Sequence, residues 1–279
     1  MEIVSRYIDE TFDINNCSNY ILSIQCKLDG FSFAVYDISV RKFIVLSSYE
    51  FNAVTPFMLK TFLDKMFDNE PILQNVFKRV VVGYQTLKYL LAPAALVDHN
   101  QIELLQDFSF QVNRDESVIK SNLLNGYWAV TSVPKTIKAF FKDKFSDIQL
   151  LPGIVPVFKY AEKKHGPTSK MFIEFTGRTL LIVVKLEQHV EFANSFYVKN
   201  EADCLFYILN ASGKIKSKPI SEIVIMGNIE KDSKLIAQLK HYFEKVKLAQ
   251  ISDGYSVSYT FMKKDIHQYI SLLELALCE

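Results

Sequence analysis

The sequence predicts an α/β protein of two lobes, each built on a mixed α+β sheet with helices on both faces. Three observations support this class. An antiparallel three-strand meander opens each half of the chain, alternating strands and helices follow each meander, and the two meanders begin about 150 residues apart. We therefore expect an internal duplication, with domains at 1–150 and 151–279 facing each other across a cleft.

The first meander consists of three short apolar runs separated by turns. Tyr20–Gln25 and Phe31–Asp37 flank the pair Asp29-Gly30, which favours a tight hairpin turn between two strands. Lys42–Ser47 follows within a few residues and supplies the third strand.

Helices and a buried strand follow the first meander. Thr55 and Pro56 provide an N-cap and a first-turn proline for a helix whose apolar residues recur at helical spacing as far as Met66. The β-branched run Lys78–Gly83 is typical of a buried parallel strand. We further predict helices over Leu87–Leu96, Gln101–Phe108 and Pro134–Phe145, and a strand over Tyr127–Ser132.

The second half repeats this order of elements. Met171–Phe175 and Thr179–Lys185 form a hairpin, and Val190–Phe196 is its third strand. A helix over Ile154–Lys164 joins the halves, and the segment 163–168 breaks the chain before the hairpin. The remaining predicted elements are a helix at Glu201–Asn210, a strand at Glu222–Gly227, a helix at Asp232–Phe243, a weak strand at Val246–Leu248 and a last helix at Asp265–Leu277.

Composition excludes several classes of protein. The chain is 49% hydrophobic and 23% charged, which is enough apolar material for full cores. Thirty-two Lys and Arg against 31 Asp and Glu leave a net charge of +1, so we predict no binding to nucleic acid. Nine glycines are few for a chain of 279 residues, which weighs against glycine-rich phosphate loops.

The N-terminal residues and the cysteines predict a cytoplasmic protein with reduced thiols. Acids occur early at the N-terminus, which has no basic region followed by an apolar run, so we predict no signal peptide. The longest apolar stretch, Tyr89–Val97, is about half the length of a membrane span. No zinc or disulfide spacing is found among the cysteines, Cys17, Cys26, Cys204 and Cys278.

Familiar catalytic motifs are missing from the sequence. It contains no GxxxxGK[ST], no GxGxxG and no GxSxG. We expect the isolated histidines to be surface or packed side chains without a catalytic role; they are His99, His165, His189, His241 and His267.

The stretch Ile154–Lys163 leading into Met171–Gly177, together with the doubled meander, resembles the actin, sugar-kinase and Hsp70 superfamily. The layout is most similar to the actin-like proteins of pilus assembly and cell division. As a whole, the chain resembles a family of Bacteroidetes proteins that has this fold and no assigned activity. The resemblance implies an actin-like ATPase architecture with two ribonuclease H-like lobes.

The resemblance also implies where nucleotide would bind. Members that hydrolyse ATP carry an Asp at the end of the first strand of each hairpin, then a glycine-rich turn, and they hold adenosine at a paired glycine. In this chain the first acid, Asp29, is inside the turn beside Gly30. The second acid is a glutamate, Glu174, followed by Thr176 and Gly177 in the turn. At the adenosine position, Gly227 is followed by Asn228 in place of the second glycine.

Each of these positions also has a plain structural interpretation. Asp29-Gly30 suits an ordinary hairpin turn, and Glu174 can be an ordinary strand residue. Gly227-Asn228 suits a turn between strand and helix, because Asn tolerates positive φ.

Our leading hypothesis is a scaffold or adaptor protein with an actin-like fold that has lost its catalytic acids and binds a protein partner. It does not favour ATP and Mg²⁺ as cofactors. The alternative is a divergent ATP-binding enzyme or nucleotide-dependent switch that uses Glu174 for Mg²⁺ and Gly227-Asn228 for adenosine. Nuclease chemistry is a third, weaker hypothesis, because it needs several carboxylates around two metals roughly 4 Å apart. The identity of the partner and the oligomeric state stay open.

Overall fold

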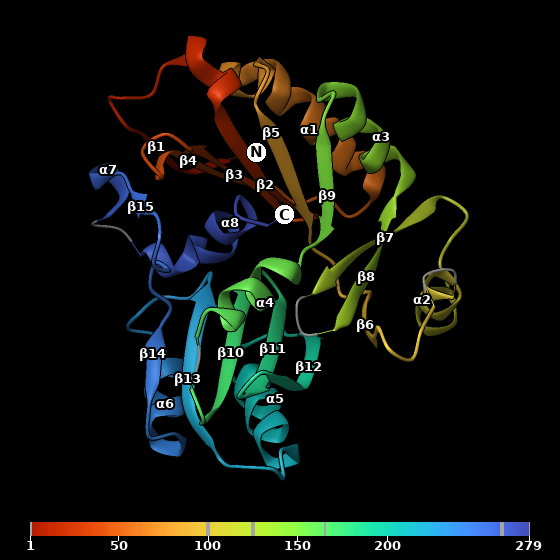
Figure 1. Cartoon of the computed structure of the whole chain (residues 1–279), viewed down its shortest axis with the longest axis vertical. Helices are drawn as coiled ribbons and strands as arrows, with labels where there is room; N and C mark the ends of the chain where they lie inside the picture. The colour runs from red at the N-terminus through yellow and green to blue at the C-terminus, as the bar shows by residue number, and fades with distance from the viewer. Residues whose placement is uncertain (1, 99–100, 124–125, 165, 263–264, 279) are drawn as a thin grey trace. The chain divides into compact units, whose positions relative to one another are not determined.

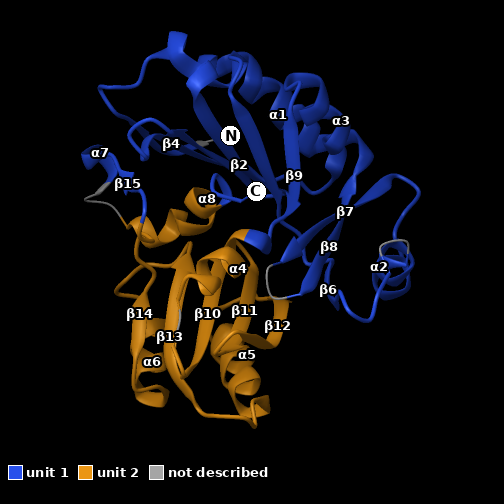
Figure 2. Ribbon diagram, viewed as in Figure 1, with its two compact units in different colours: residues 1–155, 254–262, 275–279 blue, residues 156–253, 263–274 orange. Residues whose placement is uncertain are grey.

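The computed structural model describes residues 2–98, 101–123, 126–164, 166–262 and 265–278 (Figure 1). His99 and His165 lie outside this part of the chain. The chain divides into two compact units (Figure 2). Unit 1 contains Met1–Val155, Gly254–Met262 and Leu275–Glu279, and unit 2 contains Pro156–Asp253 and Lys263–Glu274. Each unit is built around a sheet of mixed parallel and antiparallel strands, which confirms the predicted class.

The sheet of unit 1 contains the first predicted meander. Its strands run in the order β1-β4-β3-β2-β5-β9, and β15 pairs with β4. Strands β1 to β4 pair antiparallel, whereas β5 and β9 extend the sheet in parallel from β2. The strands are β1 (Glu2–Ile8), β2 (Tyr20–Lys27), β3 (Gly30–Asp37), β4 (Lys42–Glu50), β5 (Arg79–Tyr84), β9 (Ile148–Pro152) and β15 (Ser256–Val257).

Two helices cover one face of this sheet. They are α1 (Pro56–Asn69) and α3 (Lys135–Lys144). Helix α1 begins as predicted, because the Thr55 side chain accepts a hydrogen bond from the Met58 backbone N–H. Phe67 of α1 packs edge-to-face on Phe140 of α3, with ring centroids 5.0 Å apart. Unit 1 also contains the 3-10 helices η1 (Ile14–Asn19) and η2 (Pro71–Gln74).

A small sheet with one helix is inserted in unit 1 between β5 and α3. It is built from β6 (Tyr89–Pro93), α2 (Ile102–Phe110), β7 (Glu116–Leu123) and β8 (Tyr127–Pro134), with the strand order β6-β8-β7. The predicted helix over Leu87–Leu96 is therefore wrong. A short apolar run fits either a helix or a strand, and pairing with β8 makes this one the strand β6.

Unit 2 repeats the strand order of unit 1. Its sheet runs β12-β11-β10-β13-β14, which matches β4-β3-β2-β5-β9 strand for strand. The first three strands pair antiparallel, and β13 and β14 continue in parallel, so the predicted repetition of element order is confirmed. The strands are β10 (Ser169–Thr176), β11 (Thr179–Leu186), β12 (His189–Tyr197), β13 (Ile220–Gly227) and β14 (Val246–Leu248).

Helices pack on both faces of the sheet of unit 2. Helices α5 (Glu201–Lys214) and α6 (Lys234–Tyr242) lie on one face, over a core that includes Met171 and Ile173. Helix α4 (Val155–Glu162) lies on the other face, where Tyr160 packs edge-to-face on Phe172. The predicted last helix is divided into η3 (Ile266–Tyr269) and α8 (Ile270–Leu275), and α7 (Tyr259–Met262) precedes it in the chain.

Candidate functional site

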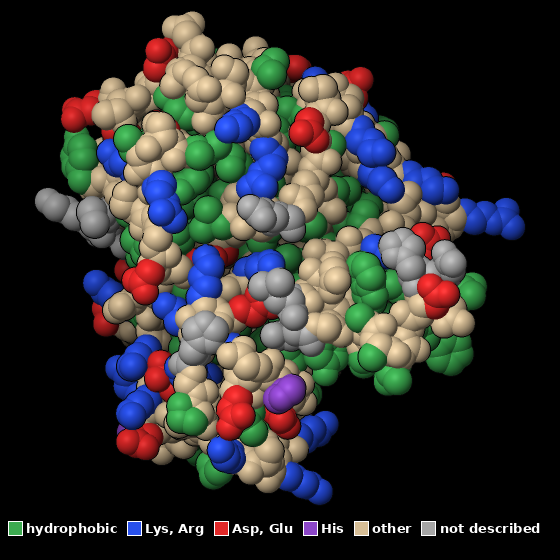
Figure 3. All heavy atoms as spheres, viewed as in Figure 1, with side chains coloured by type: hydrophobic (Ala, Val, Ile, Leu, Met, Phe, Trp, Pro, Cys, Tyr) green, Lys and Arg blue, Asp and Glu red, His purple; other side chains and the backbone are tan. Residues whose placement is uncertain are grey.

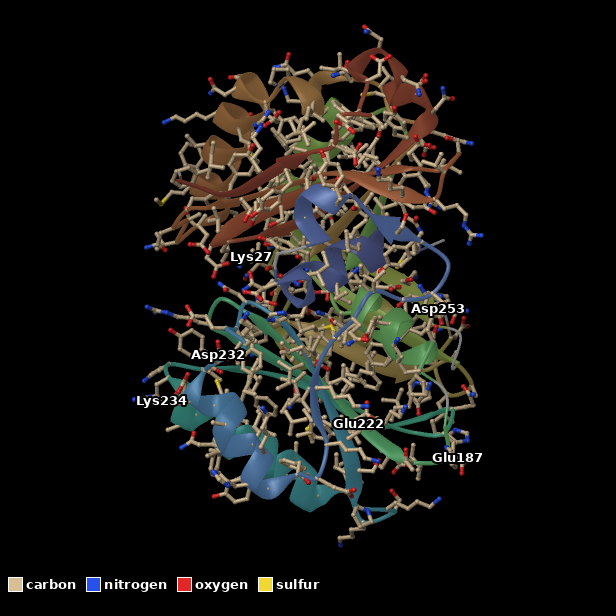
Figure 4. All side chains as sticks on the ribbon, turned by 90° about the vertical axis from the view of Figure 1, so that its left-hand side faces the viewer. Lys27, Glu187, Glu222, Asp232, Lys234 and Asp253 are labelled. Atoms are coloured by element: carbon tan, nitrogen blue, oxygen red, sulfur yellow. The ribbon has the colours of Figure 1, made fainter. Side chains whose placement is uncertain are left out.

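The turn of the first hairpin is as short as a hairpin turn can be. Lys27 pairs with Gly30 across β2 and β3, so Leu28 and Asp29 are the only loop residues. The Asp29 carboxylate forms an ion pair with Lys27, with 3.3 Å between Oδ1 and Nζ (Lys27 is labelled in Figure 4). Asp29 is therefore engaged by the hairpin itself.

The backbone of this first turn is also used inside unit 1. The carbonyl oxygens of Leu28 and Asp29 accept hydrogen bonds from the N–H groups of Ala53 and Phe51, at 3.0 and 3.3 Å. A phosphate-binding loop instead directs several free N–H groups towards one point. A two-residue turn fastened in this way offers few such groups.

The turn of the second hairpin has the same length. Thr176 pairs with Thr179, which leaves Gly177 and Arg178 as the loop. Gly177 has φ +56°, a left-handed conformation that suits glycine. The Arg178 guanidinium donates a hydrogen bond to the Tyr197 hydroxyl oxygen at 3.0 Å. The basic side chain of the turn is thus held against the neighbouring strand β12.

The turn after β13 is fixed by the backbone of β10. Gly227 has φ +87°, and a Cβ atom added to it would lie 2.0 Å from the Phe175 carbonyl oxygen. The same oxygen accepts a hydrogen bond from the Asn228 N–H at 2.7 Å. The Asn228 side chain is exposed. Gly227 is therefore required by close backbone packing, whether or not a ligand binds.

Unit 1 contains an equivalent of this backbone contact. The Gln85 N–H, just after β5, donates to the Cys26 carbonyl oxygen of β2 at 2.9 Å. Gln85 and Cys26 hold the places in unit 1 that Asn228 and Phe175 hold in unit 2. The contact at Asn228 consequently belongs to the duplicated framework of the sheet.

Glu174 is buried, with only 4% of its surface exposed. It lies on β10 between Leu181 of β11 and Met226 of β13, on the face opposite the core under α5 and α6. The Ser271 hydroxyl of α8 lies 3.6 Å from the Met226 sulfur on this same face. The C-terminal segment of unit 2 therefore packs beside Glu174.

Five of the seven predicted positions share one end of the sheet of unit 2. They are Glu174, Thr176, Gly177, Gly227 and Asn228. Asp29 and Gly30 form the corresponding turn of unit 1. Binding of a cofactor by these residues stays a prediction.

A buried lysine that no sequence motif indicates caps the C-terminal end of helix α4. Lys185 of β11 is 3% exposed, and its ammonium group donates to the carbonyl oxygens of Ala161 and Glu162, at 3.0 and 3.4 Å. These carbonyls lie in the last turn, where a helix binds cations favourably. Burial lowers the pKa of Lys185. The contact is an internal helix cap.

Further buried polar groups on the same face are likewise satisfied inside unit 2. A ring nitrogen of His267 lies 2.8 Å from the Ile229 carbonyl oxygen, so this histidine is a packed one, as predicted. Lys163 forms an ion pair of 2.6 Å with the fully buried Glu274. The first pair is 38 residues apart in the sequence and the second is 111 apart, so no local motif predicts either contact.

The acids, histidines and cysteines supply no metal centre within the described ranges. No group of three or more His, Cys, Asp or Glu side chains could hold an ion there. All four cysteines are buried, and Cys17, Cys26 and Cys204 are free thiols. Burial raises the pKa of Cys17 and of Cys204 to about 11, which keeps these thiols protonated and unreactive at neutral pH. Among the helices that can be described, none has both the length and the apolar character to cross a bilayer.

Comparison with known proteins identifies the family. A family model described as "Protein of unknown function (DUF3822)" matches residues 9–246. The chain belongs to the DUF3822 family. This DUF3822 chain matches no curated protein.

Two solved structures are similar to this DUF3822 chain over nearly its full length. The first is a Bacteroides thetaiotaomicron protein with an actin-like ATPase fold and unknown function, at 21% identity and a TM-score of 0.78, covering 96% of this chain and all of the other. The second is the PilM-PilN type IV pilus biogenesis complex, at 9% identity and a TM-score of 0.63, covering 92% and 97%. The actin-like ATPase fold is thereby confirmed.

Proposed function

We propose that this DUF3822 chain acts by binding a protein partner, as a scaffold or adaptor, and does not turn over nucleotide. One observation carries the proposal. Both hairpins at the phosphate-binding positions of the fold close with two-residue turns, and the first turn is hydrogen-bonded to the segment after β4. Phosphoryl transfer depends on positioning the phosphates with backbone N–H groups, cationic side chains and a metal ion.

The burial of Glu174 supports the same proposal. Mg²⁺ usually keeps several of its waters and is bound through one or two carboxylates together with substrate phosphates. A carboxylate that is 4% exposed, beside Met226, whose sulfur contacts the Ser271 hydroxyl, leaves little room for a hydrated ion.

A protein partner agrees with what a chain of this fold can do. The PilM-PilN structure is a complex of two proteins, and one of its chains has the fold of this DUF3822 member. We further propose a cytoplasmic setting, which the free, buried thiols of Cys17, Cys26 and Cys204 support.

A divergent ATP-binding enzyme or switch is the second candidate. One specific observation favours it: Glu174, Thr176, Gly177, Gly227 and Asn228 meet at one end of the sheet of unit 2. This is the end at which ligands bind in open α/β sheets.

Titration calorimetry with Mg-ATP and Mg-ADP at millimolar concentration, combined with a phosphate-release assay, separates the two candidates. We expect no saturable heat and no hydrolysis above the rate without protein. Hydrolysis that is lost in Glu174→Gln but kept in the exposed control Glu244→Gln would overturn the proposal. Binding without hydrolysis would instead support a nucleotide-dependent switch.

A further inference from the structure

Helix α2 of the inserted sheet exposes two large apolar side chains. Phe108 is 89% exposed and Leu104 is 69% exposed. Residues four positions apart lie next to each other on a helix surface, so the two side chains form one apolar patch. Figure 3 shows hydrophobic and acidic side chains together at the place of α2 in Figure 1. A contiguous apolar patch on a surface is a candidate interaction site.

The opposite side of α2 anchors the helix and fixes the direction of the patch. Ile102 and Gln106 are fully buried. The Gln106 side-chain amide donates to the Lys88 carbonyl oxygen at 3.1 Å, and the Thr131 hydroxyl of β8 donates to that same oxygen at 2.6 Å. Because α2 is held in this way, Leu104 and Phe108 are presented outward on a supported helix.

The charged side chains on α2 itself are both acidic. Glu103 and Asp107, both exposed, form the row of side chains next to Leu104 and Phe108. The segment 89–113 carries Asp98, Glu103 and Asp107 and contains no Lys or Arg, although the whole chain has a net charge of +1. The patch is therefore apolar with an acidic border.

The acidic border of the patch determines which kind of partner can bind there. Two copies of α2 pairing face to face would bring four carboxylates together, which opposes such a dimer. A segment with Lys or Arg beside an apolar stripe would satisfy both features of the surface.

We propose that the outward face of α2, formed by Glu103, Leu104, Asp107 and Phe108, docks a basic amphipathic segment of a partner protein. This inference rests on the proposed function and assigns the partner surface to the insertion. In unit 2, β13 leads to α6 without any inserted strand or helix in the described part of the chain, so α2 is an addition to the duplicated framework. Phe108 is the central anchor, since aromatic side chains dominate binding hot spots.

The test selects binders from a displayed library of random peptides of roughly 15 residues, about four helical turns. The full chain is the target, and the double variant Leu104→Gln/Phe108→Gln serves for counter-selection. We expect enriched peptides with a positive net charge and apolar residues at helical spacing. Fluorescence anisotropy should then show that the double variant weakens binding about thirtyfold.

Two further variants separate the role of the patch from general effects. Phe206→Gln on α5 makes the same chemical change at a residue that is 60% exposed, and it should leave peptide affinity unchanged. Glu103→Lys should weaken binding about fivefold at low ionic strength and less at high salt, because rim charges are screened. Melting temperatures close to that of the parent chain would show that the variants are folded.

Three results would overturn the inference: enrichment of acidic or neutral peptides, equal binding by the double variant, or no enrichment at all. Sedimentation velocity provides a fourth. Self-association that the double variant abolishes would identify a second copy of this chain as the occupant. The nucleotide assays are independent of α2, so failure here leaves the proposed function standing with its partner surface elsewhere.

Discussion

Gly227 lies so close to Phe175 that a Cβ atom on the glycine would stand 2.0 Å from the Phe175 carbonyl oxygen. The contact joins the ends of β13 and β10, and Gly227 is also the position at which the resemblance to actin-like proteins predicts an adenosine-binding glycine. In this chain the glycine has a sufficient structural reason, because both its positive φ and its missing side chain are needed.

Replacing Gly227 with Ala should lower the free energy of unfolding by about 3 kcal/mol, from backbone strain and the clash with Phe175. Urea denaturation measures the loss. Gly213→Ala on α5 is the matched control. A Cβ there meets nothing within 4 Å, so this variant should be as stable as the parent or about 0.5 kcal/mol more stable. Equal stability of both variants would contradict the packing at Gly227.

Replacing Glu70 with Gln should destabilise unit 1 by about 2 kcal/mol. Glu70 is 2% exposed and accepts hydrogen bonds from the Arg6 guanidinium and, at 2.6 Å, from the Tyr49 hydroxyl. Removing one charge leaves the partners imperfectly paired, and the partial exposure of Arg6 limits the cost. Asp64→Asn, in the exposed pair with Lys60, should change stability by less than about 0.5 kcal/mol. Thermal melts of both variants test this contrast.

The stability of the chain should depend on Asp9 in a pH-dependent manner. Burial by itself raises the pKa of Asp9, but hydrogen bonds from Lys42, Ser258 and Thr11 outweigh it and hold the pKa well below its ordinary value of 3.8. A carboxylate of this kind stabilises the fold above pH 3.8, and the contribution is lost as the pH falls further.

Asp9→Asn should therefore cost about 2 kcal/mol at pH 7, with the difference from the parent shrinking below about pH 4. Denaturation curves recorded between neutral and acidic pH measure this difference. Asp253→Asn, at an exposed position, provides the control and should have little effect. A difference that stays constant down to the most acidic pH would contradict the assigned interactions.

Replacing Lys185 with Met should destabilise unit 2 by about 1.5 kcal/mol. The methionine keeps most of the apolar stem but removes the donor to the Ala161 and Glu162 carbonyl oxygens, which are left without their cap. Hydrogen exchange should show faster opening of α4 in this variant. Lys240→Met, on the exposed side of α6, should leave the exchange of α4 unchanged.

Much of the framework could be predicted because its signals are local. Asp29-Gly30 between two alternating runs predicts the first hairpin, and Thr55-Pro56 predicts the start of α1. The second half shows the same signals in the same order. Repetition of element order was therefore visible without any identity between the two halves.

Strands with mixed polar and apolar residues were missed. Strand β1 contains Ser5 and Arg6, and β7 mixes half-buried polar residues such as Lys120 and Ser121 with Ile119, so neither forms a distinct apolar run. The sequence predicts a helix at strand β6, since its short apolar run fits both periods. In each of these cases, pairing with another strand decides the structure.

The candidate site was predictable only in part. The turn residues could be located from the hairpins, and the register of β10 with β13 then brings Thr176 and Gly227 to one end of the sheet. The burial of Glu174 and the role of Lys185 depend on α8 and α4 packing onto the sheet, and no local pattern encodes these contacts.

The first and last strands of the insertion that carries α2 are paired with each other, so the insertion begins and ends at neighbouring points of unit 1. Tyr89, near its start, is the cross-strand partner of Thr131, near its end. The Cα atoms of such partners are about 5 Å apart, so the rest of unit 1 only has to bridge a short distance between the two ends of the insertion. Relatives can consequently lengthen, trim or exchange this module during evolution while the ancestral scaffold persists, and recognition can diversify independently of foldability.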